Sequence, residues 1–110
     1  MVQETISRIE SQLRANESLN AEKKEELLSL VRELKKEVSG LAETRREDAQ
    51  SIAGFTETSV HEATRKERDQ ELLSHSLDGL ALSVRRLEVS HPRLVGIINA
   101  IGQTLWKIGI

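Results

Sequence analysis

The chain has 110 residues, carries a net charge of −2 and contains no cysteine. It is long enough for one small domain, which we assign to residues 1–110, and it can form no disulfide, thiolate metal site or thiol nucleophile. A charge balance this close to neutral gives no global field to attract nucleic acid, so we expect no nucleic-acid partner. Ala, Glu, Lys, Leu and Arg make up about half of the residues, which is typical of long helices and coiled coils.

The N-terminal part of the chain has the hydrophobic periodicity of two helices. Residues 2–15 place a few apolar side chains on one face and predict a weak first helix. A clearer pattern follows Asn20, the expected N-cap of a helix that begins at Ala21 and runs to about Glu47. Its apolar residues recur at spacings of 4, 3, 4 and 3, the heptad period at which helices pack together. This first seam consists of Leu27, Val31, Leu34, Val38 and Leu41.

The middle of the chain, residues 48–68, has the least distinct pattern. Arg45 and Asp48 interrupt the apolar seam, and Gly54 weakens a helix by about 1 kcal/mol relative to Ala. We expect this segment to be helical only in part. We also expect it to be the least stable helical region, because it has little apolar area to bury.

A further helix with a clear seam is predicted over residues 70–88, with Asp69 as its N-cap. Its apolar residues again follow the heptad period. No alternating strand pattern and no hairpin signal occurs in the sequence, so the predicted fold class is all-α. The second seam consists of Leu73, Leu77, Leu80, Val84 and Leu87.

Residues 91–110 form the most apolar part of the chain and predict a short C-terminal helix. Pro92 suits the first helical turn because it fixes φ and lacks an N–H, which makes His91 or Ser90 the expected N-cap. Gly109 is the expected C′ residue, in the left-handed conformation that ends many helices. The third seam consists of Leu94, Ile98, Ile101, Leu105 and Ile108.

The three seams and the small number of aromatic residues, two in all, indicate how the helices assemble. Few large rings leave a narrow core of Leu, Ile and Val, as between paired helices. We predict an elongated helical hairpin or bundle with coiled-coil-like seams. We expect it to form a homo-oligomer, because the seam side chains and the C-terminal helix must be covered by some partner surface. This predicts a structural or protein-interaction role.

The alternative is a peripheral protein that lies on a membrane surface through its C-terminal helix. Residues 85–110 carry four basic side chains and one acidic side chain, so the apolar end is also mildly basic. Interfacial helices usually have a broad charged face, however, and this helix has only a narrow polar stripe. Burial of the helix is therefore favoured over membrane contact, and a cytoplasmic location is expected.

Candidate catalytic and metal-binding groups are sparse. His61 lies four residues after Glu57, and His75 lies three residues before Asp78, but two ligands do not make a metal site. No phosphate-binding glycine loop, nucleophile elbow or paired-carboxylate motif is present. We therefore expect no metal, no cofactor and no enzymatic activity.

The C-terminal quarter of the chain contains a distinctive run, LEVSHPRL at residues 87–94, and a closing Gly109-Ile110. Together they resemble the ending of a family of short, uncharacterised bacterial proteins described as a domain of unknown function. That ending has a Glu, two further residues, His-Pro, a Leu and a final Gly-Ile. The run SIAGF at residues 51–55 also resembles members of the family. The resemblance implies a small, helical, bacterial protein and supplies no activity and no functional residues.

Overall fold

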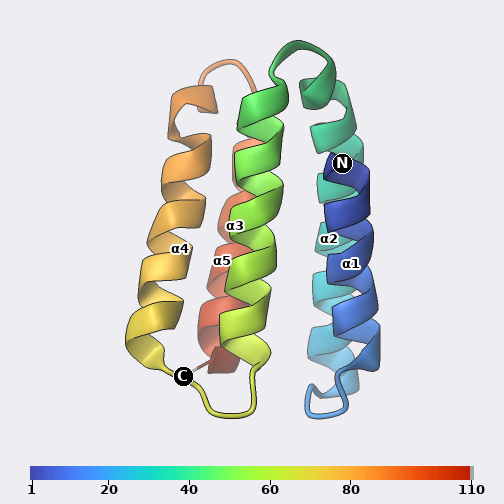
Figure 1. Ribbon diagram of the computed structural model, residues 1–110, viewed down its shortest axis with the longest axis vertical. Coiled ribbons are helices and arrows are strands. Elements are labelled where there is room, and N and C mark those ends of the chain that lie inside the picture. The colour runs from blue at the N-terminus through green and yellow to red at the C-terminus, as the bar shows by residue number, and fades with distance from the viewer. Residues whose placement is uncertain (110) are drawn as a thin grey trace.

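The computed structural model describes residues 1–109, and almost all of them are helical (Figure 1). A short 3₁₀ helix, η1 (Arg85–Leu87), follows the fourth helix. No strand occurs in the part of the chain that the structure describes. The predicted all-α bundle is therefore confirmed. Its α-helices are α1 (Val2–Ala15), α2 (Ala21–Thr44), α3 (Arg46–Thr64), α4 (Gln70–Val84) and α5 (Pro92–Gly109).

The helices pack into a compact bundle. Its radius of gyration is 12.9 Å, close to the ~13 Å typical of a folded chain of this length. The bundle measures 37 × 25 × 21 Å, and its long axis follows the helices. The longest helix, α2, has 24 residues and spans about 36 Å at 1.5 Å per residue. The bundle is therefore about as long as its longest helix.

The order of the helices in space places α4 at an edge of the molecule. Figure 1 shows the α1–α2 hairpin on one side and α4 on the other, with α3 and α5 between them. Contacts agree with this view, because α1 packs only on α2 and α3, whereas α4 packs on α3, α5 and η1. α3 packs on all four other α-helices. It is therefore the central helix, and one side of α4 faces away from the bundle.

Two of the predicted helix starts are confirmed by side-chain hydrogen bonds. The Asn20 side chain accepts a hydrogen bond from the Lys23 backbone N–H at 2.8 Å. The Asp69 carboxylate accepts hydrogen bonds from the backbone N–H groups of Glu71 and Leu72, at 3.0 and 3.1 Å. Such caps satisfy N–H groups that have no partner within the helix, and they fix where α2 and α4 begin.

The second helix ends earlier than predicted, at Thr44 instead of near Glu47. Arg45 has φ −137° and ψ 63°, outside the helical region, and α3 begins at the next residue. The Arg45 guanidinium donates a hydrogen bond to the Asp48 carboxylate at 3.0 Å, and a negative charge in the first turn of a helix is favourable. The polar residues that interrupt the apolar seam therefore mark a boundary between two helices.

The middle segment is helical in part, as predicted, because its helix ends at Thr64 and residues 65–68 belong to no helix. The helical part is better packed than the apolar pattern predicts. α3 is one continuous helix over Arg46–Thr64. Its inward face consists mainly of small side chains, which let neighbouring helices approach closely, so a central helix here needs few large apolar residues. This packing argues against the expectation that the segment is the least stable helical region. The buried residues of α3 are Ala49, Ile52, Ala53, Thr56, Ser59, Val60 and Ala63.

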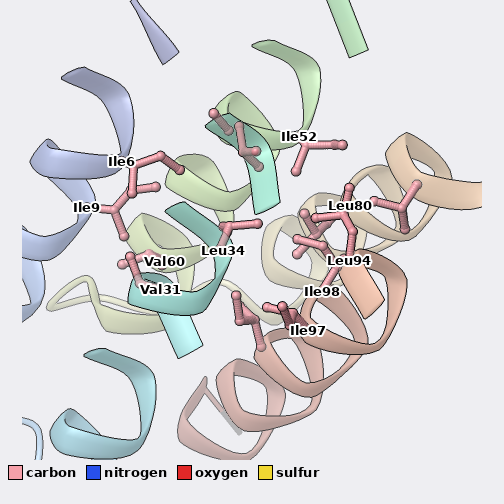
Figure 2. Packing of buried hydrophobic residues seen from close by; sticks show 14 of the residues in the cluster. Ile6, Ile9, Val31, Leu34, Ile52, Val60, Leu80, Leu94, Ile97 and Ile98 are labelled. Atoms are coloured by element: carbon pink, nitrogen blue, oxygen red, sulfur yellow. The ribbon is translucent and has the colours of Figure 1, made fainter. Parts of the chain in front are cut away.

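The predicted seams form the hydrophobic core of a single chain (Figure 2). Of the fifteen seam side chains, only Leu77 and Ile108 are half-buried, and each of the others exposes at most 2% of its surface. Side chains that the chain's own helices cover offer no surface to a second copy, so the seams explain the fold and not self-association. The covered residues are Leu27, Val31, Leu34, Val38, Leu41, Leu73, Leu80, Val84, Leu87, Leu94, Ile98, Ile101 and Leu105.

Candidate interaction surface

The start of α5 agrees with the sequence prediction. Pro92 is the first residue of the helix. The carbonyl of His91 accepts a hydrogen bond from the backbone N–H of Val95 at 3.2 Å. This is the bond that an N-cap carbonyl makes, and proline is well suited to the position that follows because it has no N–H to satisfy.

The end of α5 corrects the prediction for Gly109. This glycine is the last residue of the helix, and no residue in the described part of the chain has a positive φ. The predicted left-handed C′ role is therefore wrong. Gly109 is instead a point of close packing, because a Cβ built there would overlap the side chain of Leu73 in α4 and would lie 3.6 Å from the Ala63 Cα in α3.

The apolar face of α5 is not available to a membrane surface, because the chain's own helices cover it. The basic residue at its start, Arg93, is also occupied. Its guanidinium lies 3.3 Å from the Glu33 carboxylate and 3.4 Å from the Glu37 carboxylate, both in α2. No helix within residues 1–109 combines the length and the apolar character needed to cross a bilayer. The membrane-surface alternative depended on this helix and loses its support.

The large hydrophobic side chains that remain exposed are unevenly distributed over the bundle. Within residues 1–109, α1 and α2 expose none, and Met1 is the only one that precedes α3. Leu82 on α4 is 61% exposed, and Val89 in the loop before α5 is 96% exposed. Apart from Met1, the exposed large hydrophobic side chains therefore belong to α3, α4, α5 and the loop before α5. They are Phe55, Leu72, Leu82, Val89 and Trp106.

The outer side of α4 carries a stripe of exposed residues at heptad spacing. Five exposed positions follow one another at intervals of 3, 4, 3 and 4 residues, and Leu82 lies directly beside them. Residues at these intervals share one face of a helix. Helix α4 thus has two heptad stripes, a buried one of leucine and an exposed one of mixed character. We call the exposed stripe the α4 surface; it comprises Glu71, Ser74, Asp78, Ala81 and Leu82 of α4 together with Arg85, which directly follows α4 and begins η1.

Two shallow grooves flank the α4 surface. One, of about 250 Å³, lies between α3 and α4, with Phe55, Gly79 and Leu82 among its lining residues. The other, of about 200 Å³, lies between α4 and α5 and is lined on the α4 side by Leu77 and Ala81 among others. The α4 surface is therefore a ridge between two grooves, a shape against which another helix can pack.

Several charged side chains already have partners within the chain. The Arg8 guanidinium on α1 lies 2.9 Å from the Glu57 carboxylate on α3, and this hydrogen bond raises the pKa of Arg8. The pKa of Arg65 is raised in the same way by its hydrogen bond to the Glu62 carboxylate, at 2.9 Å. The charges in these ion pairs are therefore unavailable to a partner protein.

Two charges of the α4 surface are among the exposed charges without such a partner. Asp78 and Arg85 are both exposed and have no ion-pair partner among residues 1–109. Asp78 lies on α4 and Arg85 is the first residue of η1, with Leu82 between them in the sequence. One exposed carboxylate and one exposed guanidinium are therefore free to bind groups outside the chain.

His61, one of the two histidines considered as metal ligands, lies beside a different carboxylate from the one considered. The His61 imidazole lies 3.9 Å from the Glu62 carboxylate, whereas the Glu57 carboxylate binds Arg8. Over the range 1–109, no three His, Cys, Asp or Glu side chains are grouped so that they could hold a metal ion.

The α4 surface was not identified from the sequence because the leucine seam dominates the pattern of this helix. Glu71, Asp78 and Arg85 repeat at seven-residue intervals and were a possible signal. In a sequence alone, however, charged residues at such intervals indicate a solvated face. Only the exposure of Leu82 and the position of α4 at the edge of the bundle distinguish this face from other charged faces.

Comparison with protein families gives one match that covers the α4 surface. The model of a domain of unknown function (DUF4404) matches residues 37–110. This region contains the last turns of α2 and all of α3, α4 and α5. No curated protein and no solved structure matches the chain.

Proposed function

The chain belongs to the family of the domain of unknown function DUF4404, and we propose that it is a structural protein-interaction module that self-associates through the α4 side of its bundle. One observation carries this proposal. Apart from Met1, the large hydrophobic side chains exposed within residues 1–109 lie on α3, α4, α5 or the loop between α4 and α5. Two of them, Phe55 and Leu82, line the same groove beside α4, and neighbouring exposed apolar side chains are typical of an interaction site.

The opposite side of the bundle supports the same proposal by contrast. The exposed face of α2 carries glutamates, Arg32, Lys36 and serines, and no large hydrophobic side chain. A mixed, charged surface of this kind suits contact with water. The two sides of the molecule therefore differ as expected if one faces solvent and the other faces a partner.

The proposal also covers the cellular setting. It places the protein in the bacterial cytoplasm, without a cofactor, an enzymatic activity or a nucleic-acid partner. The support comes from the sequence: the chain contains no cysteine and has a net charge of −2, and its ending resembles that of a bacterial family.

Light scattering on the full chain tests the proposal. Wild-type protein at tens of micromolar, the range of moderate affinities, should have at least twice the chain mass of 12.4 kDa. Leu82→Asp should lower the mass to that of one chain, because it places a carboxylate in the apolar contact. Ser29→Asp is the matched control, since it adds the same charge at an exposed position of α2 and should leave the mass unchanged. Wild-type protein that is monomeric throughout this range would refute the proposal.

A further inference from the structure

We infer that two copies of this chain meet through the C-terminal ends of their α4 helices, which run antiparallel about a two-fold axis that passes between Ala81 and Leu82. The inference rests on the proposed self-association and adds the partner, the geometry and the residues in contact. A two-fold contact uses the same surface on both copies, so that surface must be complementary to itself. The α4 surface meets this condition in its charges and in its side-chain sizes.

The charges are arranged symmetrically about the inferred axis. Asp78 precedes Ala81 by three residues, and Arg85 follows Leu82 by three residues. In an antiparallel pair of helices, the Asp78 carboxylate of one copy therefore faces the Arg85 guanidinium of the other, and the two-fold axis produces this pair twice. Because neither side chain has an ion-pair partner within residues 1–109, both are available for the contact.

The apolar residues of the α4 surface lie at the centre of the same arrangement. The exposed Leu82 of one copy faces Ala81 of the other, where the small side chain leaves room for the leucine. The grooves on both sides of α4, of about 250 and 200 Å³, offer space for the neighbouring side chains of the partner helix. Burial of Leu82 supplies apolar stabilisation, and the charged pairs select the antiparallel register.

The mixture of charges favours a second copy over a different protein. A docking surface for an acidic or a basic partner would carry mainly the opposite charge. The α4 surface instead carries an acidic half, with Glu71 and Asp78, and a basic end at Arg85. About the inferred axis, Asp78 of each copy comes opposite Arg85 of the other, which is the relationship between two copies about a two-fold axis.

Charge reversal tests this contact in full-length protein. Asp78→Arg places two guanidinium groups opposite each other, and Arg85→Asp places two carboxylates opposite each other. Each variant alone should therefore dimerise at least about tenfold more weakly, because two attractive pairs become repulsive. In an equimolar mixture the two variants should form a heterodimer, since every reversed residue then faces its complement. The double variant Asp78→Arg/Arg85→Asp should likewise dimerise as the wild type does.

Sedimentation analysis of each variant, of the mixture and of the double variant provides the readout, with circular dichroism to show that the exposed substitutions leave the helices folded. Should a reversal reduce helicity, Asp78→Lys and Arg85→Glu repeat the design with residues that form helices well. A wild-type dimer that both single variants preserve overturns this contact and leaves self-association standing. A mixture in which no heterodimer forms also overturns it. A wild-type monomer overturns both the contact and the proposed function.

Discussion

Gly109 of α5 lies so close to Leu73 of α4 that a Cβ at position 109 would overlap the leucine side chain. The Ala63 Cα of α3 is 3.6 Å from the same point, so three helices converge around one glycine. Glycine costs a helix about 1 kcal/mol relative to alanine. Here the close approach of the helices explains its presence.

We expect Gly109→Ala to lower the free energy of unfolding by roughly 1–3 kcal/mol, because the buried Leu73 must move to admit the methyl group. Gly96→Ala is the matched control in the same helix, since Gly96 is exposed and a Cβ there has no neighbour within 4 Å. It should raise stability by up to about 1 kcal/mol. Urea unfolding measures both. If Gly109→Ala and Gly96→Ala stabilised the protein equally, the close contact between Gly109 and Leu73 would be contradicted.

Ile101 tests whether the α5 seam belongs to the core of one chain. It is 0% exposed, so Ile101→Asp buries a carboxylate without a partner, and such burial costs several kcal/mol. With ~5–15 kcal/mol of total stability typical of a domain, we expect this variant to unfold or to melt at a much lower temperature. Gln103→Asp adds the same charge at an exposed position two residues away and should change the melting temperature little. An unchanged melting temperature for Ile101→Asp would place the seam on the surface.

Ser59 of α3 is a buried residue whose hydroxyl has no hydrogen-bond partner within the described residues. An unpaired buried polar group costs about 1–3 kcal/mol. Ser59→Ala removes this cost, so we expect it to stabilise the protein by roughly 1 kcal/mol more than Ser51→Ala does. The second substitution makes the same change at an exposed position of the same helix and so controls for helix propensity. A smaller gain at position 59 than at position 51 would mean that the Ser59 hydroxyl has a partner in solution.

Hydrogen exchange of the backbone amides should be slow in the centre of α3. This helix packs on all four other α-helices, and opening it would expose the interior of the bundle, so its amides should exchange only through global unfolding. The terminal helix α1, which packs on α2 and α3 alone, should exchange faster. Mass spectrometry of peptic fragments resolves the two helices. If the amides of α3 are less protected than those of α1, the middle of the chain is the least stable helical region, as its sequence pattern predicts.

The sequence predicted the helices where apolar residues are large and evenly spaced. The seams beginning at Leu27, Leu73 and Leu94 were placed correctly, as were the caps at Asn20 and Asp69. The central position of α3 could not be predicted in this way. Its buried face is built mostly from Ala, Ser and Thr, and these residues do not stand out in a hydrophobic pattern although they allow helices to pack closely.

The candidate site could be predicted less well than the fold. Heptad spacing shows that a helix face packs against something, but not whether the neighbour belongs to the same chain. From the sequence, the seams therefore predict contacts between copies, whereas the five helices bury most of the seam side chains within one chain. The α4 surface is the opposite case. In the sequence its charged and small residues indicate a solvated face, and only the position of α4 at the edge of the bundle shows that this face is open to a partner. Its exposed Leu82 is the residue that separates it from an ordinary polar face.

The most direct measurement for the claim that copies meet at α4 is disulfide formation at a single introduced cysteine, since the chain has none of its own. Ala81→Cys lies beside the inferred two-fold axis, whereas Ser29→Cys lies on the exposed face of α2. Under mild oxidation and at equal concentration, a non-reducing gel should show rapid formation of a covalent dimer with Ala81→Cys and only slow formation with Ser29→Cys. Equal rates for the two variants would contradict the account.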